Sequence, residues 1–198
     1  MLQAHSIGAR HRFRPFRIAV LDTEPASREQ LVGAVAEVGI EVRVKGPLRQ
    51  NVVALIRPTG CDAALVGMDD PGRTEIRLTP AIDCPLLLCS SKTGPETAIV
   101  AQKIGAMAFL LKPIRPEQLV PTLAIATSLF REAQFLRRAL VERKIIERAK
   151  GKLMEHQRTT EDAAFQWLRR RAMDTRTRIA DVAREVLTAP DERQAPSG

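Results

Sequence analysis

Short strand-like segments alternate with helix-like segments up to about Leu119 of this 198-residue chain. The strand-like segments are apolar runs at 17–21, 40–44, 62–68, 85–89 and 107–111. Helices are predicted around 31–38, at 52–56 and at 96–104, and a turn at 69–72; Gly39 and Gly105 stand where a helix end favours glycine. Strands that alternate with single helices form βαβ units and one parallel sheet with both faces covered. The first part of the chain is therefore predicted to be a doubly wound α/β domain of flavodoxin-like (βα)5 type.

Beyond Pro116 this alternation stops, and helix-forming residues run almost unbroken over 117–156. An apolar repeat lies within this run, formed by Leu129, Ala133, Leu136 and Leu140. The repeat covers only about two heptads, so a coiled coil between two copies and an amphipathic helix packed within one copy both fit it.

Two short helices follow the long one. Thr160 with Glu161 and Asp162 is predicted to cap the first of them, and Asp174 with Thr175 to cap the second. We divide the chain into a disordered basic tail (1–15), the α/β domain (16–126), a linking, coiled-coil-like helix (127–142), a three-helix bundle (143–188) and a disordered tail (189–198).

Composition narrows the classes of function. A formal net charge of +8 favours a nucleic-acid partner, whereas 4% aromatic residues and no Tyr argue against a single-strand binder built on stacking rings. The three cysteines form no C-x-x-C pair and have no nearby His cluster, so we expect no metal and no cofactor. Neither a nucleophile–base pair nor a phosphate-binding loop is visible, so we do not expect an enzyme.

No membrane or export signal is visible in the sequence. Apolar runs stay far below the roughly 20 residues that span a bilayer. The first 14 residues lack the apolar core of a secretory signal. We therefore expect a cytoplasmic protein that does not bind membranes.

Polar residues follow the predicted strands at the edge where a parallel sheet binds its ligands. They are Asp22, the segment from Gly67 to Asp70, Ser90 and Lys112. Over roughly 16–126 this arrangement resembles the receiver domain of two-component response regulators. That family holds Mg²⁺ with an acidic pair after the first strand and phosphorylates an Asp at the end of the third. A Ser or Thr after the fourth strand and a Lys before Pro after the fifth complete the family's site, and Asp22, Ser90 and Lys112 match it.

Two positions depart from the receiver pattern. Gly67 stands at the phosphoacceptor position, and Thr23 replaces one of the two metal-binding acids. Without a carboxylate nucleophile no acyl phosphate forms, and one acid fewer weakens the Mg²⁺ site. The chain thus resembles a pseudo-receiver with a degenerate phosphorylation site, in which Lys112 is expected to pair with Asp22. By strand alternation Asp69 lies on the same side as Gly67, but beyond the expected end of the strand. Phosphorylation of Asp69 or Asp70 stays open as an alternative.

Three different motifs follow one another in the last third of the chain. They are Ala-Lys-Gly-Lys-Leu-Met at 149–154, Ala-Phe-Gln-Trp-Leu-Arg at 164–169 and Asp-Val-Ala at 181–183. Together they resemble the ANTAR domain, named for the amidase- and nitrate-operon antiterminators. The resemblance implies a three-helix module that binds leader mRNA hairpins as a homodimer and so prevents a terminator from forming. Members with a degenerate receiver are held inactive by a ligand-sensing negative regulator protein, and the resemblance implies such a partner here.

Basic side chains of this module are the candidates for RNA contact, because the planar arginine fork binds phosphate and stacks on bases. The candidates are Arg148, Lys150, Arg169, Arg170, Arg176 and Arg178. We expect the core to contain Ala149, Leu153, Met154, Phe165 and Leu168. Trp167 is expected to pack partly against the first helix of the module. Gly151 is unfavourable inside a helix, so we expect it to serve a close helix approach or a clear path for RNA.

Two other functions remain open at this level. One is a phosphorylated response regulator with a DNA-binding output, against which Gly67 argues. The other is a dimeric protein-interaction adaptor without RNA binding. The controlled operon and the sensed small molecule have no signature in the residues.

Overall fold

The computed structural model describes residues 16–48, 56–70 and 82–189. The chain divides into two compact units, Met1–Glu132 and Ala133–Gly198, which we describe separately. Both tails that we predicted to be disordered, apart from Ala189, lie outside the described residues. So does the predicted helix at 52–56, apart from Ile56.

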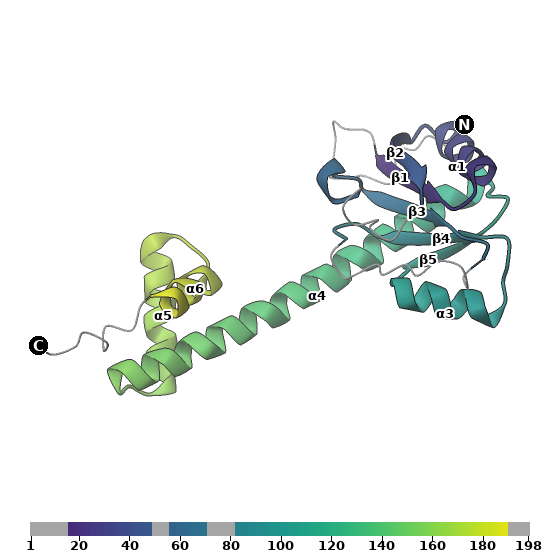
Figure 1. The fold of residues 1–198 in the computed structure, drawn as a ribbon. Helices are drawn as coiled ribbons and strands as arrows, with labels where there is room; N and C mark the ends of the chain where they lie inside the picture. The colour runs from purple at the N-terminus through teal and green to yellow at the C-terminus, as the bar shows by residue number, and fades with distance from the viewer. Residues whose placement is uncertain (1–15, 49–55, 71–81, 190–198) are drawn as a thin grey trace, which may run out of the picture. The chain divides into compact units, whose positions relative to one another are not determined.

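The first unit is built on a five-stranded sheet with the order β2-β1-β3-β4-β5 (Figure 1). Every pair of neighbouring strands is parallel. The strands are β1 (Arg17–Asp22), β2 (Glu41–Pro47), β3 (Ala63–Gly67), β4 (Leu86–Ser90) and β5 (Ala108–Leu111). This sheet confirms the doubly wound, flavodoxin-like fold predicted from the alternation.

Helices cover both faces of the sheet because successive side chains of a strand point to opposite faces. The helices are α1 (Pro25–Glu37), the 3-10 helix η2 (Arg57–Thr59), α3 (Pro95–Ile104) and the start of α4 (Pro116–Gln157). Ile18 and Val20 of β1 pack in one cluster with α1 and α4. Ala19 and Leu21 pack in the other with Ile104 of α3.

Two glycines end helices of this unit as predicted. Gly39 follows α1 with a φ of 71°, and Gly105 follows α3 with a φ of 68°. Both lie in the left-handed region, where a residue without Cβ meets no steric penalty. The second strand was predicted at 40–44 but extends to Pro47, since the backbone of β2 follows β1 as far as Asp22.

Helix α4 runs from Pro116 to Gln157 as one element of 42 residues. It begins in the first unit and ends in the second. The linking helix predicted at 127–142 therefore has no break at either end. No Gly or Pro interrupts residues 122–150, so the sequence provides no stop signal there.

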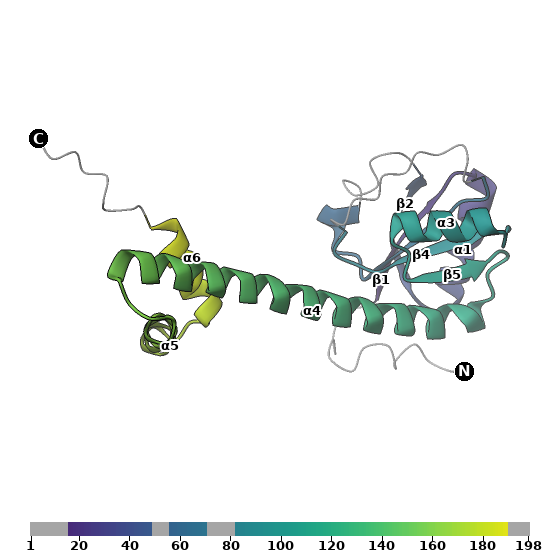
Figure 2. The same ribbon diagram turned by 90° about the horizontal axis from the view of Figure 1, so that it is seen from below.

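In the second unit α5 (Glu161–Thr175) and α6 (Ile179–Thr188) pack against the C-terminal part of α4 (Figure 2). Residues spaced by three or four positions form the shared core, because such residues lie on one side of a helix. The buried core residues are Ala149, Leu153, Ala164, Leu168, Ala172, Val182 and Ala183. The predicted cap at Thr160 is present, since its side chain accepts a hydrogen bond from the Ala163 N–H at 3.3 Å.

The cap predicted for the last helix was wrong. Asp174 and Thr175 belong to α5, which ends at Arg176 with a left-handed φ of 54°. The Thr177 N–H then donates to the Ala172 carbonyl at 3.0 Å and closes the helix end. Helix α5 extends this far because Ala172 is part of the core, so the chain turns only after that contact.

Candidate functional site

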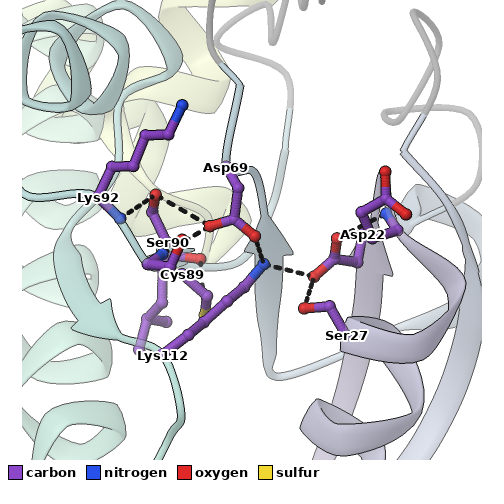
Figure 3. Close-up of polar contacts among 10 residues, drawn as sticks. Asp22, Ser27, Asp69, Cys89, Ser90, Lys92 and Lys112 are labelled. Atoms are coloured by element: carbon purple, nitrogen blue, oxygen red, sulfur yellow. Dashed lines mark hydrogen bonds and ion pairs between the residues drawn. The ribbon is translucent and has the colours of Figure 1, made fainter.

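Four polar side chains meet beyond the carboxyl ends of β1, β3, β4 and β5: Asp22, Asp69, Ser90 and Lys112 (Figure 3). Lys112 Nζ lies 2.9 Å from Asp22 Oδ2 and 2.9 Å from Asp69 Oδ2. The predicted Lys112–Asp22 ion pair is therefore confirmed. The sheet topology brings these groups together because the carboxyl ends of parallel strands share one edge.

The Asp22 carboxylate is completely buried, so its charge needs partners within the protein. The Glu24 N–H donates to Oδ1 at 2.9 Å, and the Ser27 hydroxyl donates to Oδ2 at 2.8 Å. Together with Lys112, these groups satisfy both oxygens. Asp22 is thus held by its own loop, by the start of α1 and by the lysine after β5.

Asp69 enters the same site from the loop after β3. Its Oδ1 accepts the Ser91 N–H at 2.5 Å and the Ser90 hydroxyl at 3.3 Å, and its Oδ2 accepts Lys112. Burial alone raises the pKa of this carboxyl, but the Ser91 amide and Lys112 outweigh it and hold the pKa at about 2. The pKa of Lys112 is raised because the two carboxylates outweigh its own burial. Asp69 therefore stays ionised at neutral pH.

The sequence did not identify Asp69 as a member of this cluster. Strand alternation placed it on the correct side, but it follows β3 by two residues, and the direction of a loop has no periodic signal. The chain keeps close to β4 past the end of β3, since the Met68 N–H donates to the Cys89 carbonyl at 2.9 Å. This contact directs Asp69 toward Ser90 and Ser91.

Gly67 lies directly opposite Asp22 in the pairing of β1 and β3. A Cβ built on Gly67 would overlap the Asp22 carboxylate. The space that a side chain at this position needs is thus already filled by Asp22. No aspartate fits at position 67 unless Asp22 moves.

The described residues contain no group of three or more His, Cys, Asp or Glu that could hold a metal ion. Burial raises the pKa of Cys84 and of Cys89 to about 12, so both thiols stay protonated at neutral pH. These cysteines pack in the sheet as small apolar residues.

In the second unit Lys150 is surrounded by acidic and aromatic partners. Its Nζ lies 2.8 Å from Glu147 Oε2 and 2.7 Å from Glu161 Oε1, and 6.0 Å from the centre of the Phe165 ring. The hydrogen bonds that Lys150 donates to Glu147 and Glu161 raise its pKa. Lys150 thus ties α4 to the first turn of α5, a use that its position in the sequence did not reveal.

Arg178 has acidic partners as well. It lies 2.9 Å from Glu142 and 3.2 Å from Asp181, and so connects α4 with the start of α6. The remaining candidates for RNA contact are exposed and form no ion pair within the described residues: Arg148, Arg169, Arg170 and Arg176. Of the six predicted contact residues, these four present the unneutralised positive charge.

Arg169 and Arg178 both line an open groove of about 560 Å³ between α4, α5 and α6. Its floor and walls are mainly apolar, with Ile146, Ala172 and Met173 among them. The groove thus combines guanidinium groups with apolar surface. A guanidinium group can bind phosphate, and apolar surface can contact the face of a base. Glu142, which pairs with Arg178, also lines the groove.

The core of this unit differs from the prediction at two positions. Ala149, Leu153 and Leu168 are buried as expected, but Met154 and Phe165 are each 37% exposed. Each of these two follows a core residue directly, and a step of one residue turns a helix by about 100°, so its side chain lies on the flank. Trp167, which we expected to pack partly against α4, is 39% exposed.

Gly151 does not serve a close helix approach among the described residues. A Cβ built there meets no atom within 4 Å.

Helix α4 also presents large apolar side chains to solvent. Phe135, Leu136, Leu140 and Val141 are 71%, 54%, 60% and 53% exposed. Two of them, Leu136 and Leu140, belong to the apolar repeat found in the sequence. No element of the described second unit covers them.

Comparison with known proteins adds three findings. The ANTAR domain family matches residues 134–187. The transcriptional regulatory protein PdtaR of Mycobacterium tuberculosis is 31% identical over 192 residues, which cover 90% of this chain and 94% of that protein. The nitrate regulatory protein of Klebsiella oxytoca is 49% identical over 53 residues, which cover 27% of this chain and 13% of that protein.

Among solved structures, the signal receiver domain of a modulated diguanylate cyclase from Desulfovibrio desulfuricans G20 matches with a TM-score of 0.53. It is 17% identical and covers 61% of this chain and 99% of that domain, which supports the fold of the first unit. Within the described residues no helix has the length and apolar character needed to cross a membrane.

Proposed function

Since the chain belongs to the family of transcriptional regulators that join a receiver-type domain to an ANTAR domain, we propose that it binds RNA hairpins in a leader transcript. Binding allows RNA polymerase to read through into the operon. The exposed arginines of the ANTAR domain carry this proposal. Four guanidinium groups that form no ion pair with any described residue can neutralise phosphates, and RNA contact releases the counterions held there.

The apolar groove beside Arg169 supports RNA over a purely electrostatic partner. An arginine beside Met173, which is 70% exposed, offers both a phosphate ligand and an apolar surface for a base splayed out of a hairpin loop. Lys150 and Arg178 contribute less to binding in this proposal, because carboxylates already neutralise them. Their part is to position α5 and α6 on α4.

The proposed regulator acts as a homodimer joined through α4. Its exposed Phe135, Leu136, Leu140 and Val141 would leave water on pairing, at a gain of roughly 25 cal/mol per Å² of apolar surface. Two RNA-binding modules held in one dimer also suit a pair of hairpins, since the second binding event is then intramolecular.

Control of this regulator by a ligand-sensing protein, and not by phosphorylation, is part of the proposal. The supporting observation is that Asp22 fills the space next to Gly67. Incubation with acetyl phosphate and Mg²⁺ should therefore leave the chain without a labile acyl phosphate in intact-mass spectra. A stable Mg²⁺-dependent adduct of one phosphoryl group would support a phosphorylated response regulator instead.

The binding experiment compares a tandem-hairpin RNA with duplex DNA of equal length in mobility-shift titrations over a series of salt concentrations. We expect tighter binding of the RNA and an affinity that falls steeply as salt rises. The variant R169A/R170A should bind the RNA at least about tenfold more weakly, since each lost phosphate contact weakens binding. The control is Arg43→Ala, which removes one positive charge from an exposed, ion-paired arginine of β2.

Equal affinity for the two nucleic acids would contradict the proposal. A dimer in gel filtration with no affinity for either would favour a protein-interaction adaptor.

A further inference from the structure

Three hydrogen-bond donors in the first unit converge on one point. Lys112 Nζ, the Ser90 hydroxyl and the Ser91 N–H all donate to the carboxylate of Asp69, at 2.9, 3.3 and 2.5 Å (Figure 3). The donors come from the ends of β4 and β5, whereas the acceptor comes from the loop after β3. An ammonium, a hydroxyl and a backbone amide that point to one place form a set that binds oxyanions.

We propose that Lys112, Ser90 and the Ser91 N–H form an oxyanion-binding site, and that Asp69 is a tethered anion that occupies it and excludes free phosphate. The inference deepens the control part of the proposed function and rests on that function for its biological role. Anion binding itself is independent of RNA and can be measured without it.

Asp69 is the member of the cluster that an external anion would replace. Asp22 is completely buried and has two further donors of its own, from Glu24 and Ser27. Asp69 keeps 29% of its side chain exposed and stands on a loop. Removal of the Asp69 side chain therefore opens the donor set to solvent while the Lys112–Asp22 pair stays in place.

Two effects keep free phosphate out while Asp69 is present. A side chain tethered in this way competes at an effective concentration in the millimolar range or above. In addition, two carboxylates around one ammonium leave the cluster with a net negative charge, which repels a second anion. Without Asp69, the remaining Asp22 and Lys112 are neutral together, and the Ser90 hydroxyl and the Ser91 N–H lose their acceptor beside the Lys112 ammonium.

Gly67 also contributes to the geometry of this anion site. Its missing side chain leaves the Asp22 carboxylate where it binds Lys112, and this pairing holds Nζ within 2.9 Å of Asp69. Position 67 at the end of β3 thus carries no acid, and Asp69, two residues later, supplies the carboxylate that fills the anion site.

The experiment titrates inorganic phosphate, with sulfate as a second oxyanion, into the ¹⁵N-labelled full chain and follows the Ser91 amide resonance. In the wild-type protein we expect this resonance to stay in place. In Asp69→Ala it should shift saturably, with a dissociation constant in the millimolar range, and Tm should rise with phosphate concentration, since a ligand of the native state stabilises it.

Three further variants test whether the site is the proposed one. Lys112→Ala in the Asp69→Ala background should remove the phosphate response, because the ammonium is its main ligand. Asp83→Ala removes an equal charge at the other end of β4, where Asp83 makes only an exposed contact of 3.8 Å with Arg57, and should not create phosphate binding. If Asp69→Ala does not fold, Asp69→Asn keeps the shape without the charge and should still respond to phosphate.

Phosphate binding to the wild-type site, or a folded Asp69 variant that shows no shift at Ser91, would overturn the inference. If the wild-type protein does not bind RNA, the proposed function is overturned and the anion site is unaffected. The two failures are therefore distinguishable.

Discussion

Each unit of this molecule holds one lysine between two carboxylates, but the two clusters differ in how far their acids are shielded from water. Lys112 and Lys150 each keep only 10% of their side chains exposed. The partners of Lys112 are 0% and 29% exposed, whereas those of Lys150 are 53% and 64% exposed. The same arrangement of charges is thus largely shielded from water in the receiver-type domain, whereas its acids are exposed to water in the ANTAR domain.

The exposure of the acids, and not that of the lysine, therefore governs whether a cluster can exchange one of its ion-pair partners. A buried carboxylate such as Asp22 cannot be rehydrated, so its lysine has to stay. Glu147 and Glu161 are largely hydrated already, so a phosphate can replace one of them on Lys150 at small loss. The predicted RNA contact at Lys150 remains a prediction of this kind of exchange.

Substitution of the two lysines should show the largest difference in stability between the two clusters. Lys112→Ala leaves Asp22 buried without its cation, and we expect it to lower the free energy of unfolding by about 3–5 kcal/mol. Lys150→Ala leaves two exposed glutamates that water solvates, so its loss should be less than half as large. Urea denaturation followed by circular dichroism measures both. Lys92→Ala, the substitution of an exposed lysine beside Ser90, is the control; equal losses for Lys112→Ala and Lys150→Ala would contradict the distinction.

Substitution of two glycines, one in each unit, should change stability in opposite directions. Gly67→Ala inserts a methyl group where the Asp22 carboxylate lies, and should destabilise the protein by about 1–3 kcal/mol. Gly151→Ala meets open space on a helix and should stabilise it by about 0.5–1 kcal/mol. Thermal unfolding reports both changes. Gly33→Ala, on α1 and also in open space, should behave like Gly151→Ala in stability but leave RNA affinity unchanged.

A further expected effect is a dependence of stability on acid in the cluster around Asp69. The contacts with Ser91 and Lys112 lower the pKa of Asp69 from 3.8 to about 2, so the stability they provide is complete above pH 3.8 and is lost as the pH falls to about 2. We expect this loss to be roughly 1–2 kcal/mol after allowance for the partly exposed carboxylate. The difference in unfolding free energy between the wild type and Asp69→Asn should shrink over the same interval. A constant difference would show that the charge of Asp69 contributes nothing.

Most of the fold could be predicted from local patterns. Short continuous apolar runs located the strands, and glycines located two helix ends, because both signals lie within a few residues of the chain. The core of the ANTAR domain was predicted less well. Met154 and Phe165 are apolar, but only packing decides which side of a helix becomes the interior.

The candidate sites show the same limit more strongly. Asp22, Ser90 and Lys112 were identified because strand ends in a parallel sheet must lie together. Asp69 was placed on the correct side but outside the site, since its loop is directed by the Met68–Cys89 hydrogen bond. Lys150 was assigned to RNA because Glu161, eleven positions later, joins it only once α5 has folded onto α4.

Three features along the chain were enough to assign the class of each part: the (βα)5 alternation, the glycine where a phosphoacceptor would stand, and the three motifs of the ANTAR domain. These features depend on residue type and spacing along the chain. Which charges are already neutralised depends on contacts between distant parts of the folded chain. Asp69 and Lys112 are 43 residues apart, and an ion pair exists only where folding brings such groups within about 4 Å and away from water.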